Sequence, residues 1–296
     1  MIRSFPLIFV LLWSSAFITT KPIVDYSDPF AALAFRFSIV AFGFFLFSVF
    51  KKQKILVPKK NALESILSGI LFHGFYLGGV FFSISKGLPT GIAALVVTLN
   101  PILTNALAGP LLNEKVTWKQ WVGVMLGFLG ATIVLGFDVG TKLPTIGIIA
   151  VFISLIAVTS ATLWQKKLSN NLSLSVSNMY QAIGGFIFHL IIVLFLAKPY
   201  IDFSSTFIIA MSHQILLVSF GAFTILMYLI KHNSASKTVS VFFLIPATSA
   251  VIAWIFLNET LNTYDILGFV IASVGVFIAT RAVSYTHLTL PTILRV

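Results

Sequence analysis

Long apolar stretches alternate with short polar gaps along almost the whole chain. A helix that crosses a bilayer needs about 20 consecutive, mostly apolar residues, and ten stretches of the sequence meet that requirement. Their approximate limits are 4–24, 29–50, 62–85, 89–112, 117–137, 143–166, 174–197, 206–230, 234–257 and 262–281. The pattern therefore predicts an all-α membrane protein with ten transmembrane helices.

The first stretch has a second interpretation. Arg3 ahead of an apolar run is also typical of a secretory signal peptide. The run reaches about residue 24 and has no clear small-x-small cleavage site. We therefore favour a membrane helix.

An internal repeat with a constant offset divides the chain. Pro101 matches Pro246 and Glu114 matches Glu259, because 246 − 101 and 259 − 114 both give 145. The offset predicts a first five-helix repeat over 1–137 and a second over 138–283. Five is an odd number, so the second repeat must enter the membrane from the opposite side, which makes the repeats inverted. The tail over 284–296 has no counterpart, and we expect it to be disordered or non-native.

The composition agrees with a membrane protein. Of the residues, 58% are hydrophobic and 9% are charged, whereas soluble domains average about 25% charged residues. The absence of Cys excludes a disulfide framework, a thiolate nucleophile and a Cys-based metal site. The formal charge of +11 does not indicate nucleic-acid binding, because Lys and Arg lie in the gaps between apolar runs.

The basic residues instead predict an orientation. Fourteen Lys and Arg lie on the side of the N-terminus and four on the other side. By the positive-inside rule, both termini are expected in the cytoplasm. We expect a multi-pass protein of a bacterial inner membrane.

Several short motifs resemble those of a known family. They are WSSAF at 13–17, AFRF at 34–37 and the two LNE sequences that end at Glu114 and Glu259. In their order and repeat spacing they resemble the EamA branch of the drug/metabolite transporter superfamily, over about residues 5 to 281. The resemblance implies a basket of ten helices with a central substrate and with the fifth helix of each half at the periphery. It implies transport of amino acids, other small metabolites or drugs, often outward.

Two prolines mark candidate helix kinks. Pro101 and Pro246 lie near the middle of their spans, where a missing N–H and a ring clash should kink the helix. A broken helix at the midplane can present polar groups to a cavity, and Thr98 and Asn100 precede the first kink. The alternative is that the prolines only shape packing.

Four further residues are candidates for a substrate cavity. Trp13 and Ser14 lie mid-span in the first helix, and His73 and Tyr76 share one face of the third. His73 could relay protons or simply be hydrogen-bonded within the core. Arg36, a charge within the second span, could neutralise a substrate carboxylate. Because it lies only about two turns from the helix end, we favour a structural role.

Glu114 and Glu259 are candidates for gates on opposite membrane faces. The alternative is that each carboxylate is solvated or lies near a helix N-terminus. Small residues recur every three or four positions in the helices over 117–137 and 262–281. Such stripes let helices approach closely, which favours intramolecular packing and leaves a homodimer through these two helices as the alternative.

The sequence thus predicts a transporter of a small organic solute, an amino acid or related metabolite, that works by alternating access. We expect no cofactor, no metal and no catalytic residue. A non-transporting, lipid-interacting or structural membrane protein is the alternative. An intramembrane enzyme is disfavoured, because the spans contain no Cys and no His pair at i, i+4 spacing.

Overall fold

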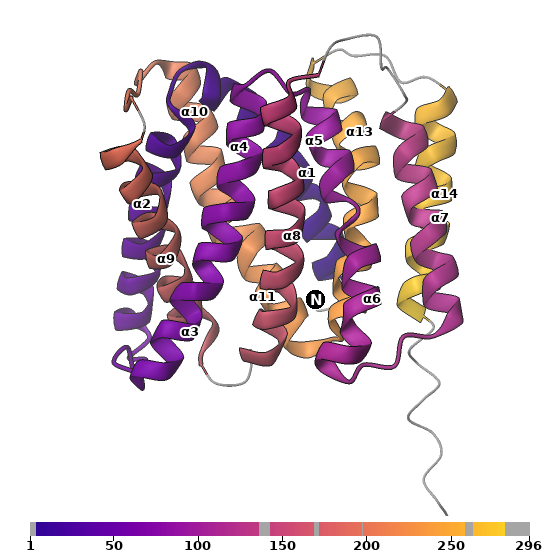
Figure 1. Ribbon diagram of the computed structural model, residues 1–296, viewed down its shortest axis with the longest axis horizontal. Coiled ribbons are helices and arrows are strands. Elements are labelled where there is room, and N and C mark those ends of the chain that lie inside the picture. The colour runs from indigo at the N-terminus through magenta and orange to yellow at the C-terminus, as the bar shows by residue number, and fades with distance from the viewer. Residues whose placement is uncertain (1–3, 136–142, 169–171, 197, 258–262, 282–296) are drawn as a thin grey trace, which may run out of the picture.

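The computed structural model describes residues 4–135, 143–168, 172–196, 198–257 and 263–281 (Figure 1). Within these ranges the elements are helices, and strand-type pairing is limited to one isolated bridge between Ser27 and Ile201. Seven of the described helices are long and apolar enough to cross a membrane, and Ile266–Thr280 is a shorter apolar helix. The expectation of an all-α membrane protein is confirmed.

The helices follow the predicted spans closely. In the first half they are α1 (Phe5–Asp25), α2 (Pro29–Phe50), α3 (Lys59–Gly69), η2 (Ile70–Leu77), α4 (Gly78–Ser85), α5 (Thr90–Val97), α6 (Asn100–Leu112) and α7 (Trp118–Leu135). In the second half they are α8 (Thr145–Leu168), α9 (Leu174–Phe195), α10 (Ser205–His213), η3 (Gln214–Ala222), α11 (Phe223–His232), α12 (Ala235–Val239), η4 (Ser240–Leu244), α13 (Ile245–Leu257) and α14 (Thr263–Arg281).

Local sequence explains where these helices start. The Asp28 carboxylate accepts hydrogen bonds from the backbone N–H groups of Phe30 and Ala31, at 3.0 and 2.9 Å, and Pro29 follows in the first turn of α2. Before α7, the Gln120 side chain accepts from the Thr117 N–H at 2.7 Å, and the Thr117 hydroxyl accepts from the Gln120 N–H at 3.3 Å. Both devices satisfy N–H groups that a helix start leaves without intrahelical partners.

Two helices of each half are interrupted at matching positions. The third span contains the π-helix η2 in the first half and η3 in the second, and the offset of 145 places Ile70–Leu77 on residues 215–222. The fourth span breaks between α5 and α6, and its counterpart contains the 3₁₀ segment η4. Pro101 and Pro246 stand in the first turn of the helix that follows each interruption.

The glycine-rich helices α7 and α14 pack against each other at one end of the molecule's long axis, away from α2 and α9 at the other (Figure 1). A Cβ added at Gly130 would lie 2.4 Å from the backbone nitrogen of Ala272, and one at Gly123 would lie 2.5 Å from that of Ala279. The glycines therefore allow close backbone contact within the chain. A homodimer, the alternative to packing within the chain, would need the same glycine faces, so the structure favours the packing interpretation of the stripes.

Candidate functional site

A small cavity lies where α1, α2, η2, α4 and η3 meet. Its volume is about 30 Å³, enough for one or two water molecules. The lining residues are Trp13, Ala16, Phe17, Thr20, Arg36, Phe72, His73, Tyr76, Leu77, Val80, Phe81, Gln214, Val218, Ser219 and Phe223. Both halves of the chain therefore contribute to its wall.

The two π-helices supply seven of the residues that line this cavity. They are Phe72, His73, Tyr76 and Leu77 of η2 and Gln214, Val218 and Ser219 of η3. A π-helix shifts the register of side chains against the α-helical turns on either side, and such segments often occur at functional sites. The cavity is thus built on the pair of interruptions that the repeat relates.

Arg36 provides the positive charge of the cavity. Its side chain is only 2% exposed, and its Nε donates a hydrogen bond of 2.9 Å to the Ser219 hydroxyl in the other half. The guanidinium also lies over the ring of Phe37, 5.4 Å from the centroid. No carboxylate of the described residues comes within 4.0 Å of Arg36. The cavity thus has a buried cation and no carboxylate placed to neutralise it.

Aromatic rings form the apolar wall. Phe72 is central: its ring centroid lies 6.0 Å from that of Trp13, 5.1 Å from Tyr76 and 5.1 Å from Phe223. All four side chains are buried. Aromatic pairs at these separations hold each other in defined orientations, and these rings meet Phe72 at interplanar angles of 75°, 82° and 56° respectively.

His73 is fixed between the cavity and α9. Its ring centroid lies 4.4 Å from that of Phe37 and 4.5 Å from that of Phe223. Its backbone carbonyl accepts a hydrogen bond of 3.0 Å from His189 Nε2. A Cβ at Gly185 would lie 2.5 Å from the Cβ of His73, so a glycine is needed for α9 to approach this closely. Neither His73 Nδ1 nor His189 Nδ1 has a hydrogen-bond partner among the described residues.

The structure brings together only some of the predicted cavity residues. Trp13, His73 and Tyr76 line the cavity. The Ser14 hydroxyl instead donates to the Ile245 carbonyl at 3.2 Å, next to Pro246, and joins α1 to α13. Ser14 therefore lies outside the cavity, on the side of α1 that packs on the other half.

Thr98 and Asn100 also lie outside the cavity. Thr98 donates to the carbonyl of Leu95 in its own helix, at 2.6 Å. The Asn100 side-chain oxygen accepts hydrogen bonds from Thr104, at 2.9 Å, and from Thr159 of α8, at 3.1 Å. Because these partners satisfy the oxygen within the α6–α8 contact, Asn100 links two helices, and neither it nor Thr98 lines the cavity.

The sequence interpretation missed part of the cavity. Arg36, for which we favoured a structural role, lines it, where it is buried and donates a hydrogen bond to Ser219. A charge within a span was the signal that pointed to it. Gln214 and Ser219 gave weaker signals, and nothing distinguished Phe72 among the 30 Phe residues of the chain.

One contact between the halves lies at the N-terminal face, which we define as the end of the bundle where α1 starts and α6 ends. Phe5 of α1 packs there on Tyr228 of α11, with ring centroids 5.2 Å apart. Glu114, just after α6, accepts hydrogen bonds from the first N–H groups of α12, at 2.9 Å from Ala235 and 3.4 Å from Ser236. A carboxylate at a helix N-terminus is favoured by the helix dipole.

Lys166 holds the α11–α12 turn from within the second half. Its Nζ donates to the carbonyls of Ile230 and Asn233, at 3.0 and 2.5 Å, where α11 ends. Cations are favoured at a helix C-terminus. Glu114 and Lys166 thus hold both sides of the α11–α12 turn, each by the charge that suits its helix end.

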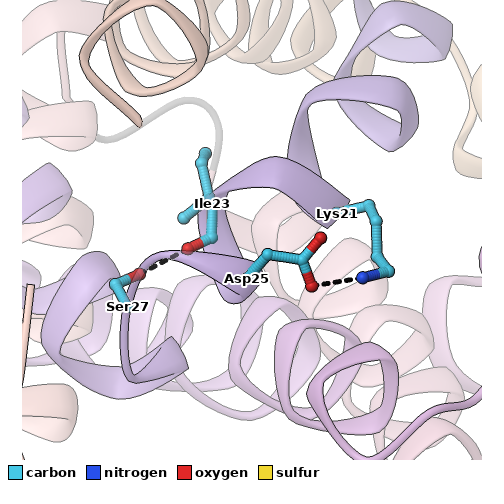
Figure 2. Close-up of polar contacts among 4 residues, drawn as sticks. All are labelled: Lys21, Ile23, Asp25 and Ser27. Carbon is cyan, nitrogen blue, oxygen red and sulfur yellow. Dashed lines mark hydrogen bonds and ion pairs between the residues drawn. The ribbon is translucent and has the colours of Figure 1, made fainter. Parts of the chain in front are cut away.

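The opposite face shows a different arrangement at the equivalent lysine. Lys21 pairs with Asp25 one turn along α1, where both side chains are about half exposed, and Ser27 donates to the Ile23 carbonyl at 2.6 Å (Figure 2). These contacts are local to one end of α1. The predicted gate residue on this face, Glu259, lies outside the described residues.

The described residues contain no cluster of three or more His, Cys, Asp or Glu that could hold a metal ion. The polar chemistry of the cavity therefore consists of one guanidinium with hydroxyl, amide and imidazole groups. It can bind a small polar or anionic group against an aromatic wall.

Several known proteins are similar to this chain over most of its length, two in sequence and one in structure. The uncharacterized transporter YyaM of Bacillus subtilis (strain 168) is 27% identical over 294 residues, covering 93% of this chain and 92% of its own. A probable amino-acid metabolite efflux pump of Salmonella typhimurium is 20% identical over 282 residues, 92% of each chain. A solved crystal structure has a TM-score of 0.79 at 15% identity and covers 93% of this chain and 95% of its own, which shows a common fold.

A family model decides the assignment. The model described as the EamA-like transporter family matches residues 4–136 and again residues 145–281. The resemblance drawn from the sequence motifs is confirmed, and relatives of this family are named as transporters. The chain is therefore an integral, multi-pass membrane protein that belongs to the EamA-like transporter family.

Proposed function

We propose that the protein carries a small organic solute, an amino acid or related metabolite, across the membrane by alternating access around the cavity at Arg36. Two inverted repeats, over 1–137 and 138–283, rock about this cavity. The observation that carries the proposal is that Lys21 and Lys166 occupy equivalent repeat positions, since 166 − 21 gives 145, yet have different partners. Equivalent groups in unequal arrangements are what alternating access requires of an inverted repeat.

The N-terminal face is the closed face in this conformation. Lys166 donates to the carbonyls of Ile230 and Asn233, and the offset of 145 places their counterparts at Ser85 and Leu88. We infer that Lys21 leaves Asp25 and donates to those two carbonyls when the opposite face closes. The exposed Lys21–Asp25 pair is weak enough to release, because exposed ion pairs contribute only about 0–1 kcal/mol.

Glu114 acts as the gate of the N-terminal face by capping α12. Glu259 is its sequence counterpart on the opposite face. By the positive-inside rule, the face closed by Glu114 and Lys166 is cytoplasmic, and both termini lie on that side. The membrane we propose is a bacterial inner membrane. A cavity closed toward the cytoplasm is one stage of either export or import, and we propose export because the Salmonella relative is named as an efflux pump.

The size of the cavity supports a cycle of opening and closing. Its volume of about 30 Å³ is far below the roughly 300–1,000 Å³ of pockets that bury a small organic ligand. A solute can enter only if the helices around Arg36 move apart. The π-helical segments, which lack regular α-helical hydrogen bonding, are the natural places for that movement.

Transport in proteoliposomes tests the proposal. Purified protein is reconstituted and loaded with a panel of labelled amino acids, organic acids, nucleosides and sugars, and efflux and uptake are both followed. We expect saturable flux of at least one solute that empty liposomes lack. Flux no greater than that of empty liposomes across the panel, in either direction and with or without a proton gradient, would favour a non-transporting membrane protein.

A further inference from the structure

We propose that the solute is an organic anion with one carboxylate and a planar apolar body, and that it carries no ammonium group. The inference rests on the proposed transport function and narrows its substrate class to the related metabolites, because a solute without an ammonium group is not itself an amino acid. It follows from what the cavity contains around Arg36 and from what it lacks.

The first step concerns the charge of Arg36. A charge taken out of water is costly unless it is paired and hydrogen-bonded. Arg36 is 2% exposed, and its side-chain hydrogen-bond partner, the Ser219 hydroxyl, is neutral. None of the 15 residues that line the cavity is Asp or Glu. A bound anion would supply the missing negative charge, and a guanidinium fits a carboxylate best because its fork can donate two parallel hydrogen bonds.

The second step concerns an ammonium group. The α-ammonium of an amino acid lies a few ångströms from its carboxylate, so in this cavity it would lie close to Arg36 and be repelled. It would also find no carboxylate in the lining. The amide nitrogen of Gln214 cannot accept from an ammonium group, because it donates to the carbonyl of Ala16 at 2.8 Å and to the hydroxyl of Thr19 at 2.9 Å. The cavity therefore suits a net anion better than a zwitterion.

The third step concerns the body of the solute. Trp13, Phe72, Tyr76 and Phe223 form a buried wall with centroid separations of 5.1 to 6.0 Å around Phe72. Aromatic rings that meet one another edge to face can meet the ring of a planar apolar solute in the same way. Once the helices move apart, a lining that combines Arg36 with these rings suits a solute that is anionic at one end and planar at the other.

The test compares three probes of one shape. They are 3-phenylpropionate, phenylalanine, which adds the ammonium group, and 3-phenylpropionamide, which removes the charge. Binding to the purified protein is measured by thermal shift, since a ligand of the folded state raises its melting temperature, and each probe is also tested as a competitor of flux. We expect 3-phenylpropionate to bind at least tenfold more tightly than either of the others, and more tightly than hexanoate, which lacks a planar body.

Three variants connect this preference to the cavity. Arg36→Gln should lower the affinity of the protein for 3-phenylpropionate to its affinity for 3-phenylpropionamide. Arg36→Lys, which keeps the charge but not the fork, should retain part of the preference. Ser219→Ala removes the hydrogen-bond partner of Arg36 Nε. It should weaken the binding of 3-phenylpropionate several-fold and leave the binding of 3-phenylpropionamide unchanged. The last two variants keep the test decisive if Arg36→Gln fails to fold.

The outcomes separate the two proposals. Binding of phenylalanine or the amide as tightly as 3-phenylpropionate, or a carboxylate preference that persists unchanged in all three variants, overturns the anion inference. Flux of neutral or cationic solutes that is indifferent to Arg36 overturns it too, while leaving the transport function in place. Flux of no solute at all counts against transport itself.

Discussion

Replacing Glu114 by Gln should open the N-terminal face. The carboxylate accepts from the Ala235 N–H at 2.9 Å and from the Ser236 N–H at 3.4 Å. Gln has one acceptor oxygen and no charge, so one bond is lost and the other loses its charge assistance. A hydrogen bond to a charged group contributes about 1.5–3 kcal/mol, and we expect the closed arrangement to lose about 1.5 kcal/mol, or about tenfold in its equilibrium constant.

The absence of cysteine in the native chain makes this prediction direct to measure. Ala16, a small residue that lines the cavity, is replaced by Cys, and its labelling by a membrane-impermeant maleimide is timed from each side in oriented vesicles. Glu114→Gln should raise the labelling rate from the N-terminal face about tenfold, the shift in the equilibrium constant, and lower it from the opposite face.

Glu64→Gln is the matched control. Glu64 lies within α3, on the same face, and is partly buried. Its substitution removes the same charge as Glu114→Gln but breaks no hydrogen bond to α12. Its labelling rates should equal those of the parent. Equal rates in the parent and in Glu114→Gln, or equal acceleration from both faces, would refute the gate role.

Three further substitutions test other parts of the structure. Gly130→Ala should lower the melting temperature in detergent, because its Cβ would lie 2.4 Å from the backbone of α14 and overpacking costs about 1–3 kcal/mol. Gly109→Ala should leave the melting temperature unchanged, because its Cβ meets nothing nearer than 3.8 Å. Equal effects of the two substitutions would contradict the close α7–α14 contact. Thr159→Val should cost about 0.6–1 kcal/mol of stability by removing the 3.1 Å hydrogen bond between α8 and α6, more than Thr132→Val, which loses only a bond within its own helix. Lys21→Gln should leave the melting temperature unchanged but slow flux, because the opposite face would close less well; unchanged flux would remove Lys21 from the proposed gating.

The helices were the most predictable part of this protein. The predicted span over 29–50 coincides with α2, and the one over 174–197 agrees with α9 to within two residues. Apolar stretches of this length must form helices in a bilayer, because only internal hydrogen bonds can satisfy the backbone there. Caps at Asp28 and Thr117 were also predictable, since they depend on neighbouring residues alone.

The cavity was predictable only in part. Trp13, His73 and Tyr76 were found because polar or amphipathic side chains stand out in an apolar helix. Ser14 and Asn100 stood out in the same way, yet they bond to Ile245 and Thr159 across helix contacts. A polar residue in a span must find some partner, and the sequence does not show whether that partner is a solute or another helix.

By itself, the sequence determined the membrane class, the positions of the helices and the relation between the two halves, because hydrophobic length and a constant offset are properties of the chain read in order. Only the tertiary structure decided that Arg36 faces Ser219, that Glu114 caps α12 and that Lys21 and Lys166 have different partners. The contacts of Arg36, Glu114 and Lys166 join residues that lie from 64 to 183 positions apart, whereas Lys21 pairs with a residue one turn away. They depend on how helices rotate and pack against one another, which the apolar pattern leaves free when every face of a helix is hydrophobic.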